Sequence, residues 1–129
     1  MDNSILIGKY IYKFLSEDDN IHKKTNNAIW PLIADSDTKY PFIVYSNTDL
    51  TPSYDKDGVV DDSLSVQIIC ISNNYTEVVE LANDVRNLLE FKHYKDNKIN
   101  ITKILVSNVG SQTVDDAYLE VLTFSITVE

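Results

Sequence analysis

The stretch VQIICISNNYTEVVELANDVRNLL, residues 66–89, decides the fold of this chain. Its beginning belongs to an alternation of polar and apolar residues over residues 63–72, which is the two-residue period of a half-buried strand. Asn74 then provides a good N-cap, and Glu77 three residues later completes a capping-box arrangement. The apolar residues that follow form one helical stripe: Val78, Leu81, Ala82, Val85, Leu88 and Leu89. We therefore predict a strand that leads directly into a long helix ending near Phe91.

The beginning of the chain predicts another helix. Asn3 or Ser4 can cap its start. The polar residues 16–27 interrupt the helical pattern and are predicted to form a loop. The apolar residues that define this helix recur at helical spacing: Ile7, Ile11, Phe14 and Leu15.

Between the two helices, the sequence predicts strands. Residues 28–34 (AIWPLIA) are apolar but contain Pro31, so they predict at best a short edge strand. Residues 40–50 (YPFIVYSNTDL) are rich in β-branched and aromatic residues and predict the first firm strand. Residues 51–62 combine proline, glycine and a run of aspartates, a composition that predicts a loop.

The C-terminal part adds two more strands. We predict them over residues 99–106 and 118–128, with a turn at residues 110–113. In the last strand one face is apolar, comprising Leu122, Phe124, Ile126 and Val128. The order of elements predicts a single α+β domain over residues 1–129. Its two main helices would pack on one face of a largely antiparallel or mixed β-sheet.

The composition and net charge of the chain restrict the classes of function that it can have. The 129 residues are 43% hydrophobic and 24% charged, which is ordinary for a globular domain. The net charge of −9 disfavours sequence-independent binding to nucleic acid and permits a basic protein partner. There is no basic stretch leading into an apolar run and no apolar run of membrane-spanning length. We expect a protein of a cytoplasm-like compartment with no membrane contact.

The residue types that most often carry chemistry do not form a site. Cys70 lies in an apolar run, and we interpret it as a buried structural thiol rather than a reactive one. His22 and His93 lie in polar stretches without a second ligand at a recognised spacing. The pair Asp115 and Asp116 suits a turn or a guarded strand edge better than acid–base work.

The aspartate-rich segment YDKDGVVDD carries carboxylates at a density that hard cations such as calcium use. Counted from Asp55, Gly58 falls at the fourth position and Val66 at the twelfth, which does not fit a calcium loop. A solvated loop is the better interpretation. With no nucleophile elbow and no glycine-rich phosphate loop, we predict no catalytic, cofactor-binding or metal-binding residues and a protein that is not an enzyme.

Taken in order, these elements resemble the tail-completion (tail-terminator) proteins of long-tailed bacteriophages, the small family related to the lambda-like tail terminator. After the N-terminal helix come the segment Ile29-Trp30-Pro31, the strand YPFIVY, a variable loop, and the final strand LTFSITVE. The strand-to-helix join carries most of the resemblance: Val66, Ile68, Cys70, Tyr75, Glu77, Leu81, Ala82, Val85, Arg86 and Leu89.

This resemblance implies a structural role in the virion tail, with assembly in the bacterial host cytoplasm. Such proteins form a homo-oligomeric ring, usually a hexamer, that caps the head-proximal end of the tail tube and contacts the head–tail connector protein. DNA passes through the ring without specific binding. Ring closure needs two different surfaces on each subunit. The candidate interface residues lie in residues 40–62: Tyr45, Asn47, Asp49, Tyr54, Asp55, Asp57, Asp61 and Asp62.

Two other functions stay open at this point. An acidic inhibitor or immunity-type protein that binds one basic partner is equally compatible with the net charge. A small enzyme would require a pocket with convergent polar residues, which the sequence does not identify. Self-association into a ring distinguishes the first interpretation from these two.

Overall fold

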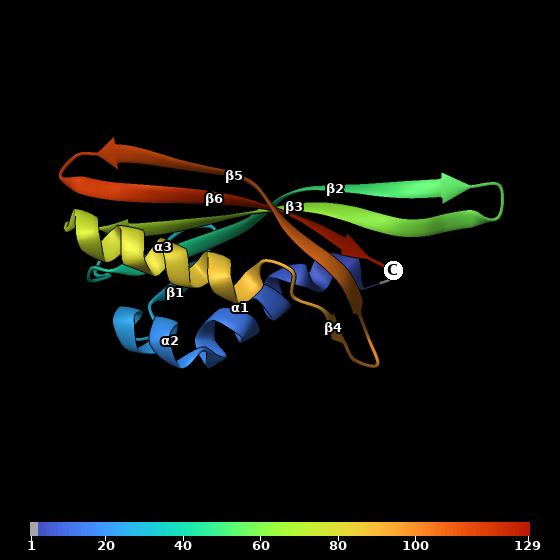
Figure 1. The fold of residues 1–129 in the computed structure, drawn as a ribbon, viewed down its shortest axis with the longest axis horizontal. Coiled ribbons are helices and arrows are strands. Elements are labelled where there is room, and N and C mark those ends of the chain that lie inside the picture. Colours follow the sequence, from blue (N-terminus) through green and yellow to red (C-terminus); the bar gives the residue numbers. More distant parts are fainter. Residues whose placement is uncertain (1–2) are drawn as a thin grey trace.

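A computed structural model describes residues 3–129, apart from the side chain of Val59. No helix in this part of the chain is both long and apolar enough to cross a bilayer. Figure 1 shows the elements, which follow in chain order: η1 (Ser4–Leu6), α1 (Ile7–Glu17), α2 (Asp19–Thr25), β1 (Ile29–Pro31), β2 (Phe42–Asp55), β3 (Gly58–Ser72), α3 (Tyr75–Leu89), β4 (Tyr94–Lys95), β5 (Asn100–Val114) and β6 (Ala117–Val128).

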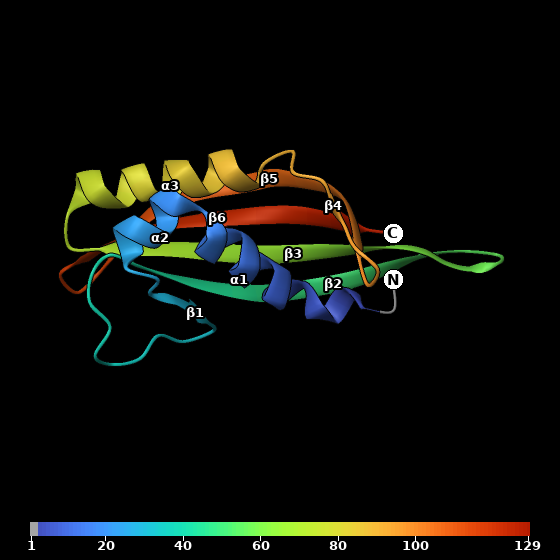
Figure 2. The ribbon, with the colours of Figure 1, turned by 90° about the horizontal axis from the view of Figure 1, so that it is seen from below.

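The strands form one mixed sheet in the order β1-β2-β3-β6-β5-β4. β1 pairs with β2 in parallel, and every other pairing is antiparallel. In Figure 2 the helices lie together on one face of this sheet, with α3 beside β6 and β5, and α1 across β2 and β3. The predicted α+β class and its one-sided helical layer are confirmed.

The core lies between this helical layer and the sheet. The inward residues of β3 and β6 meet the stripe of α3, as the two periodicities predict. Burying one such large aliphatic or aromatic side chain stabilises the fold by roughly 1.5–3 kcal/mol. The predicted apolar face of the last strand is confirmed, since each member is at most 1% exposed: Leu122, Phe124, Ile126 and Val128.

The N-terminus of α3 is capped as predicted, with one added partner. The Asn74 side chain accepts a hydrogen bond from the Glu77 backbone N–H at 3.0 Å. The reverse link runs through Ser72, whose hydroxyl donates to the Glu77 carboxylate at 2.9 Å and accepts from the Asn74 N–H at 3.2 Å. This relay fixes the angle at which β3 enters the helix.

The predicted loop over residues 16–27 is wrong, because α2 occupies most of it. The Asp18 side chain caps this helix by accepting from the Ile21 N–H at 3.1 Å. Asn26 ends it in the left-handed conformation, at φ 53°. Ile21 is the single large aliphatic residue of the helix, so the sequence carries no apolar period there. A cap and a C-terminal asparagine define this short helix instead.

The predicted loop over residues 51–62 is also wrong. β2 continues to Asp55 and β3 begins at Gly58, so a two-residue turn joins two long strands. Gly58, at φ 123°, adopts a backbone conformation that other residues rarely take. The aspartates that suggested a loop serve this turn, where Asp55 Oδ1 accepts from the Asp57 N–H at 2.7 Å.

Residues 110–113 are likewise strand rather than turn. β5 runs through them to Val114, and the chain reverses at Asp115 and Asp116, as one interpretation of that acid pair predicted. Asp115 is in the left-handed region, at φ 54°. The short edge strand expected around Pro31 is confirmed as β1.

Candidate interaction surfaces

A projecting hairpin is the most exposed feature of the sheet. The last pair between β3 and β6 is Asp62 with Val128, so residues 53–61 pair only with one another. In Figure 1 this end of β2 and β3 extends well past the helices. We call residues 53–61 the arm. An isolated two-stranded hairpin is marginally stable in water, so the arm gains little stability from its own contacts.

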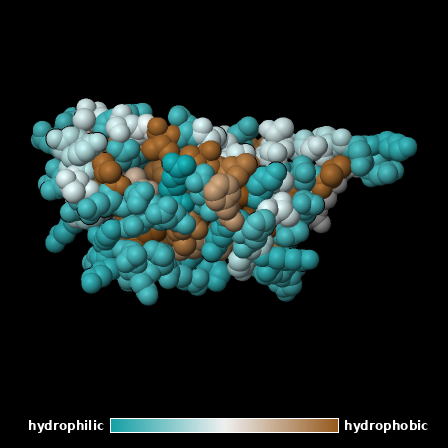
Figure 3. Space-filling model, viewed as in Figure 1, coloured by the Kyte–Doolittle hydropathy of each residue, from teal (hydrophilic) through white to brown (hydrophobic). Residues whose placement is uncertain are grey.

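The arm combines negative charge with exposed apolar groups. It carries Asp55, Asp57 and Asp61 against one Lys56, a net charge of −2. Tyr54 is 68% exposed, and Val60 is exposed as well. Figure 3 shows the tip of the arm as hydrophilic surface. Among residues 3–129 no group of three or more His, Cys, Asp or Glu side chains is placed to hold a metal ion.

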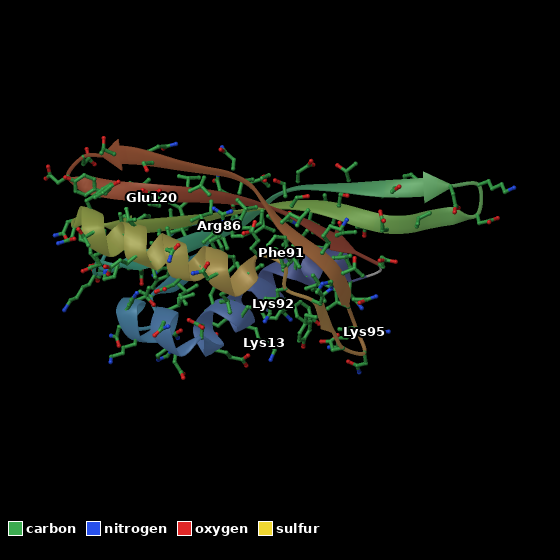
Figure 4. All side chains as sticks on the ribbon, viewed as in Figure 1. Lys13, Arg86, Phe91, Lys92, Lys95 and Glu120 are labelled. Atoms are coloured by element: carbon green, nitrogen blue, oxygen red, sulfur yellow. The ribbon has the colours of Figure 1, made fainter. Side chains whose placement is uncertain are left out.

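A second charged surface lies where the chain passes from α3 to β5. Residues 91–98 (FKHYKDNK) carry three lysines and one aspartate, a net charge of +2 with His93 neutral. We call residues 91–98 the basic corner. Figure 4 shows Lys95 at β4, whereas Lys92 and Lys13 lie nearer the middle of the view. Phe91, which precedes Lys92, is 68% exposed, so the corner also has an apolar component.

Asp96 shapes the basic corner from within. Its Oδ1 accepts the backbone N–H groups of Lys98 at 2.8 Å and Ile99 at 2.9 Å, and its Oδ2 accepts the Tyr94 hydroxyl at 3.2 Å. The N–H of Lys98, and after it that of Ile99, holds the pKa of Asp96 below its ordinary value, against the opposing effect of burial. The single acid of the corner is therefore ionised and turned inward, toward the turn.

The lysines of the basic corner have no acidic partner in an ion pair among the described residues. The ion pairs among the described residues are Lys13–Glu17, Lys24–Asp84 and Arg86–Glu90, and none involves the corner. The Lys92 ammonium lies 4.8 Å from the ring centre of Phe14, a cation–π contact. Lys95 and Lys98 are exposed.

The outer edge of β5 is a third surface. β4 covers only Asn100 and Ile101 of β5. Next to them, Phe91 N–H donates to the Ile104 carbonyl, and the Glu90 carboxylate accepts from the Val106 N–H. Residues 107–114 have no partner on this edge in the described part of the chain, and they contain neither charge nor proline. Such an edge lacks the usual protection against pairing with another strand.

The structure divides the eight predicted interface residues. Tyr45 is 8% exposed and belongs to the core, and burial raises its pKa. Asp62 is 6% exposed at the base of the arm. The remaining six lie on the open part of β2 and on the arm: Asn47, Asp49, Tyr54, Asp55, Asp57 and Asp61. The sequence prediction missed the basic corner, although three lysines spaced three apart within a polar stretch were visible.

The residues considered for chemistry occupy separate places. Cys70 is fully buried, and burial raises the pKa of its thiol, as expected for a structural cysteine. His22 is exposed on α2, and His93 is exposed in the connection between α3 and β4. Glu120 is a buried carboxylate that accepts from the Ser111 hydroxyl at 2.6 Å. Together with Tyr75 and Tyr118, Glu120 lines an open groove of 570 Å³. The lining of this groove contains no second acidic residue and no histidine.

Comparison with known proteins rests on structure alone. No family model and no curated protein matches this chain. Its structure aligns with a chain from the virion of a native gene transfer agent particle, with a TM-score of 0.81. This chain shares its fold with a virion protein. The alignment covers 92% of this chain and 91% of the other, at 15% sequence identity. At this level of identity the correspondence is one of fold.

Proposed function

We propose that this chain is a structural, non-enzymatic protein of a phage or prophage virion. It caps the head-proximal end of the tail tube as a homo-oligomeric ring and joins the tube to the head connector. The observation that carries the proposal is the fold shared with a virion protein over nearly the full length of both chains. The sequence resemblance to tail-completion proteins, carried by the order of the elements and the strand-to-helix join, supports the role at the tail.

The shape of the subunit supports assembly into a ring. A head-to-tail ring needs two unlike surfaces on every subunit. The arm and the open β2 edge provide one set of unpaired or uncovered groups, and the basic corner and the β5 edge provide another. These surfaces belong to opposite borders of the sheet order, since β2 and β5 lie on either side of the β3–β6 pair.

The net charge of −9 suits a ring through which DNA passes. A negative lumen repels phosphates, so DNA slides without adhering. This step is a separate hypothesis. An electron cryomicroscopy map of the ring in which the acidic side chains face the outer wall would contradict it.

Native mass spectrometry and negative-stain imaging over a range of protein concentrations test the proposal. We expect a closed ring, sixfold above all, either in solution or on the ends of isolated tail tubes. A protein that stays monomeric and leaves tube ends bare would contradict the tail-terminator role. A one-to-one complex with a basic protein would instead support the inhibitor function.

A further inference from the structure

We propose that the arm of one copy docks on the basic corner of the next copy, and that this contact joins neighbouring subunits. The inference deepens the proposed function by naming the two halves of one interface. The docking requires only that copies of this chain associate head-to-tail, whether or not they cap a tail tube.

The arm leaves backbone and side-chain groups uncovered, as one side of a protein interface does before its partner binds. Residues 53–61 lack a third strand, and no helix of the described chain packs on them in Figures 1 and 2. Tyr54 and Val60 are exposed large apolar side chains, and the exposed Asp57 and the half-buried Asp61 lie in the same segment. A projecting hairpin of this kind leaves both its apolar groups and its charge for a partner to cover.

The basic corner matches the arm in both respects. Lys95 and Lys98 supply exposed positive charge without an ion-pair partner in residues 3–129. Phe91 supplies an exposed ring. The net charges of the two segments are equal in size and opposite in sign, −2 for the arm and +2 for the corner. Complementary potentials of this kind guide partners into register and exclude wrong ones.

The corner is also rigid enough to act as a receptor. Asp96 fixes the turn through two backbone N–H groups. Tyr94 packs against Tyr10 and Phe14 of α1, with ring centres 5.6 and 5.1 Å apart. Lys95 and Lys98 are therefore displayed beside a turn that is held by hydrogen bonds, which reduces the entropy lost on docking.

The phosphate backbone of DNA is the alternative ligand for the exposed lysines of the basic corner. The net negative charge of the chain disfavours this alternative. The corner carries only three lysines in a chain of net charge −9. Sequence-independent DNA binding at physiological salt requires several neutralised phosphates and suffers from the repulsion of the whole molecule. The arm offers the corner both opposite charge and apolar surface, whereas a phosphate backbone offers only charge.

A charge-swap experiment tests the docking. One variant carries Lys95→Glu with Lys98→Glu, a second carries Asp57→Lys with Asp61→Lys, and a third carries all four substitutions. Sedimentation velocity over a concentration series measures self-association. We expect each double variant to need at least about tenfold more protein for half-maximal association, and the fourfold variant to return to within about threefold of the wild type.

Matched controls separate the contact from net charge. Lys23→Glu with Lys39→Glu changes the net charge of the chain by −4, as the corner variant does, at exposed lysines outside the corner. Asp35→Lys with Asp37→Lys changes it by +4, as the arm variant does, in the exposed loop before β2. We expect both controls to stay near the wild type. Controls that match the test variants, or a fourfold variant that remains dissociated, would overturn the docking.

Cross-linking covers the case in which solution association is weak. The single native cysteine, Cys70, is buried, so an introduced cysteine is the reactive one. An Asp57→Cys protein mixed with a Lys95→Cys protein should give a heterodimer with a short bis-maleimide. The same mixture with Lys39→Cys in place of Lys95→Cys should give none.

The outcomes of the two proposals are distinct. Rings that form without this cross-link, and without rescue by the charge swap, overturn the docking and leave the proposed function standing. If the arm and the basic corner cross-link but the protein never caps tail tubes, the docking is supported and the proposed function is overturned. Binding of a labelled DNA duplex that is abolished by Lys95→Glu with Lys98→Glu, with self-association unchanged, would assign the corner to nucleic acid.

Discussion

Asp96 shows how one side chain keeps a charged surface in shape. Its carboxylate closes the turn between β4 and β5 by accepting two backbone N–H groups and the Tyr94 hydroxyl. These donors favour the ionised form, so the pKa of Asp96 lies below its unfolded value. The ionised side chain therefore stabilises the folded state above the unfolded pKa. That stabilisation is lost as the pH falls through the lower, folded pKa.

The variant Asp96→Asn isolates this charge, because the amide oxygen can still accept both N–H groups. We expect it to lower the free energy of unfolding at about pH 7, and this deficit should shrink toward about pH 2, as the pH falls through the lowered folded pKa of the wild-type carboxylate. Denaturant unfolding at the two pH values measures the difference. Asp37→Asn, at an exposed aspartate in the loop before β2, is the control and should show neither effect.

Asn74 is the second residue whose role can be measured alone. Its side chain caps α3 through the Glu77 N–H, and the neighbouring Asn73 makes no such bond in the described structure. Replacing an N-cap asparagine by alanine costs about 0.5–2 kcal/mol. We expect Asn74→Ala to lower the free energy of unfolding within this range in thermal or denaturant unfolding. Asn73→Ala should change it by less than about 0.5 kcal/mol; equal losses for both would refute the capping role.

Among the elements, the arm should contribute more to assembly than to the fold. Residues 53–61 lie beyond the last β6 pair and outside the core. Replacing them with Asn-Gly, which suits a two-residue hairpin turn, should change the free energy of unfolding by less than about 1 kcal/mol. Sedimentation velocity of the same protein should show that self-association is lost. A shortened protein that unfolds readily would show instead that the arm supports the sheet.

The helices and strands that were predicted well from the sequence have a strong periodicity of apolar residues. α3, β3 and β6 each place apolar residues at the spacing of one buried face, and that face is what packs. The predicted helix over the first residues, α1, is recovered for the same reason. Strand register could not be predicted, because it depends on which faces meet in three dimensions.

The wrong predictions in the sheet involve strand segments that are stabilised by pairing with a neighbouring strand and whose own sequence has no clear apolar periodicity. β2 and β3 continue through Pro52 and the aspartates because each has the other as a neighbour, and the turn needs Gly58. β5 continues through Gly110 because β6 pairs with it there. Local composition reports turn propensity but carries no information about such a partner. The candidate surface was affected in the same way, since an expected loop proved to be a projecting hairpin.

At the scale of the whole molecule, charge acts on assembly in two opposing ways. Each copy carries −9, so copies repel one another over long distances. The arm and the corner attract one another at contact distance. Salt separates the two effects, because the Debye length falls from about 30 Å at 0.01 M to about 10 Å at 0.1 M and about 3 Å at 1 M. Moderate salt screens the long-range repulsion first, and high salt then weakens the close pairs.

Self-association of the wild type should therefore pass through a maximum as salt rises, at about 0.1–0.2 M. The variant Lys95→Glu with Lys98→Glu carries a net charge of −13 and has lost its attractive contact, so salt should only strengthen its residual association. The control Lys23→Glu with Lys39→Glu, also at −13, should keep the maximum because its corner is intact. Sedimentation velocity in a salt series distinguishes these curves. A wild type whose association rises steadily to high salt would indicate an interface driven by apolar burial alone, with the β5 edge as the first place to look for it.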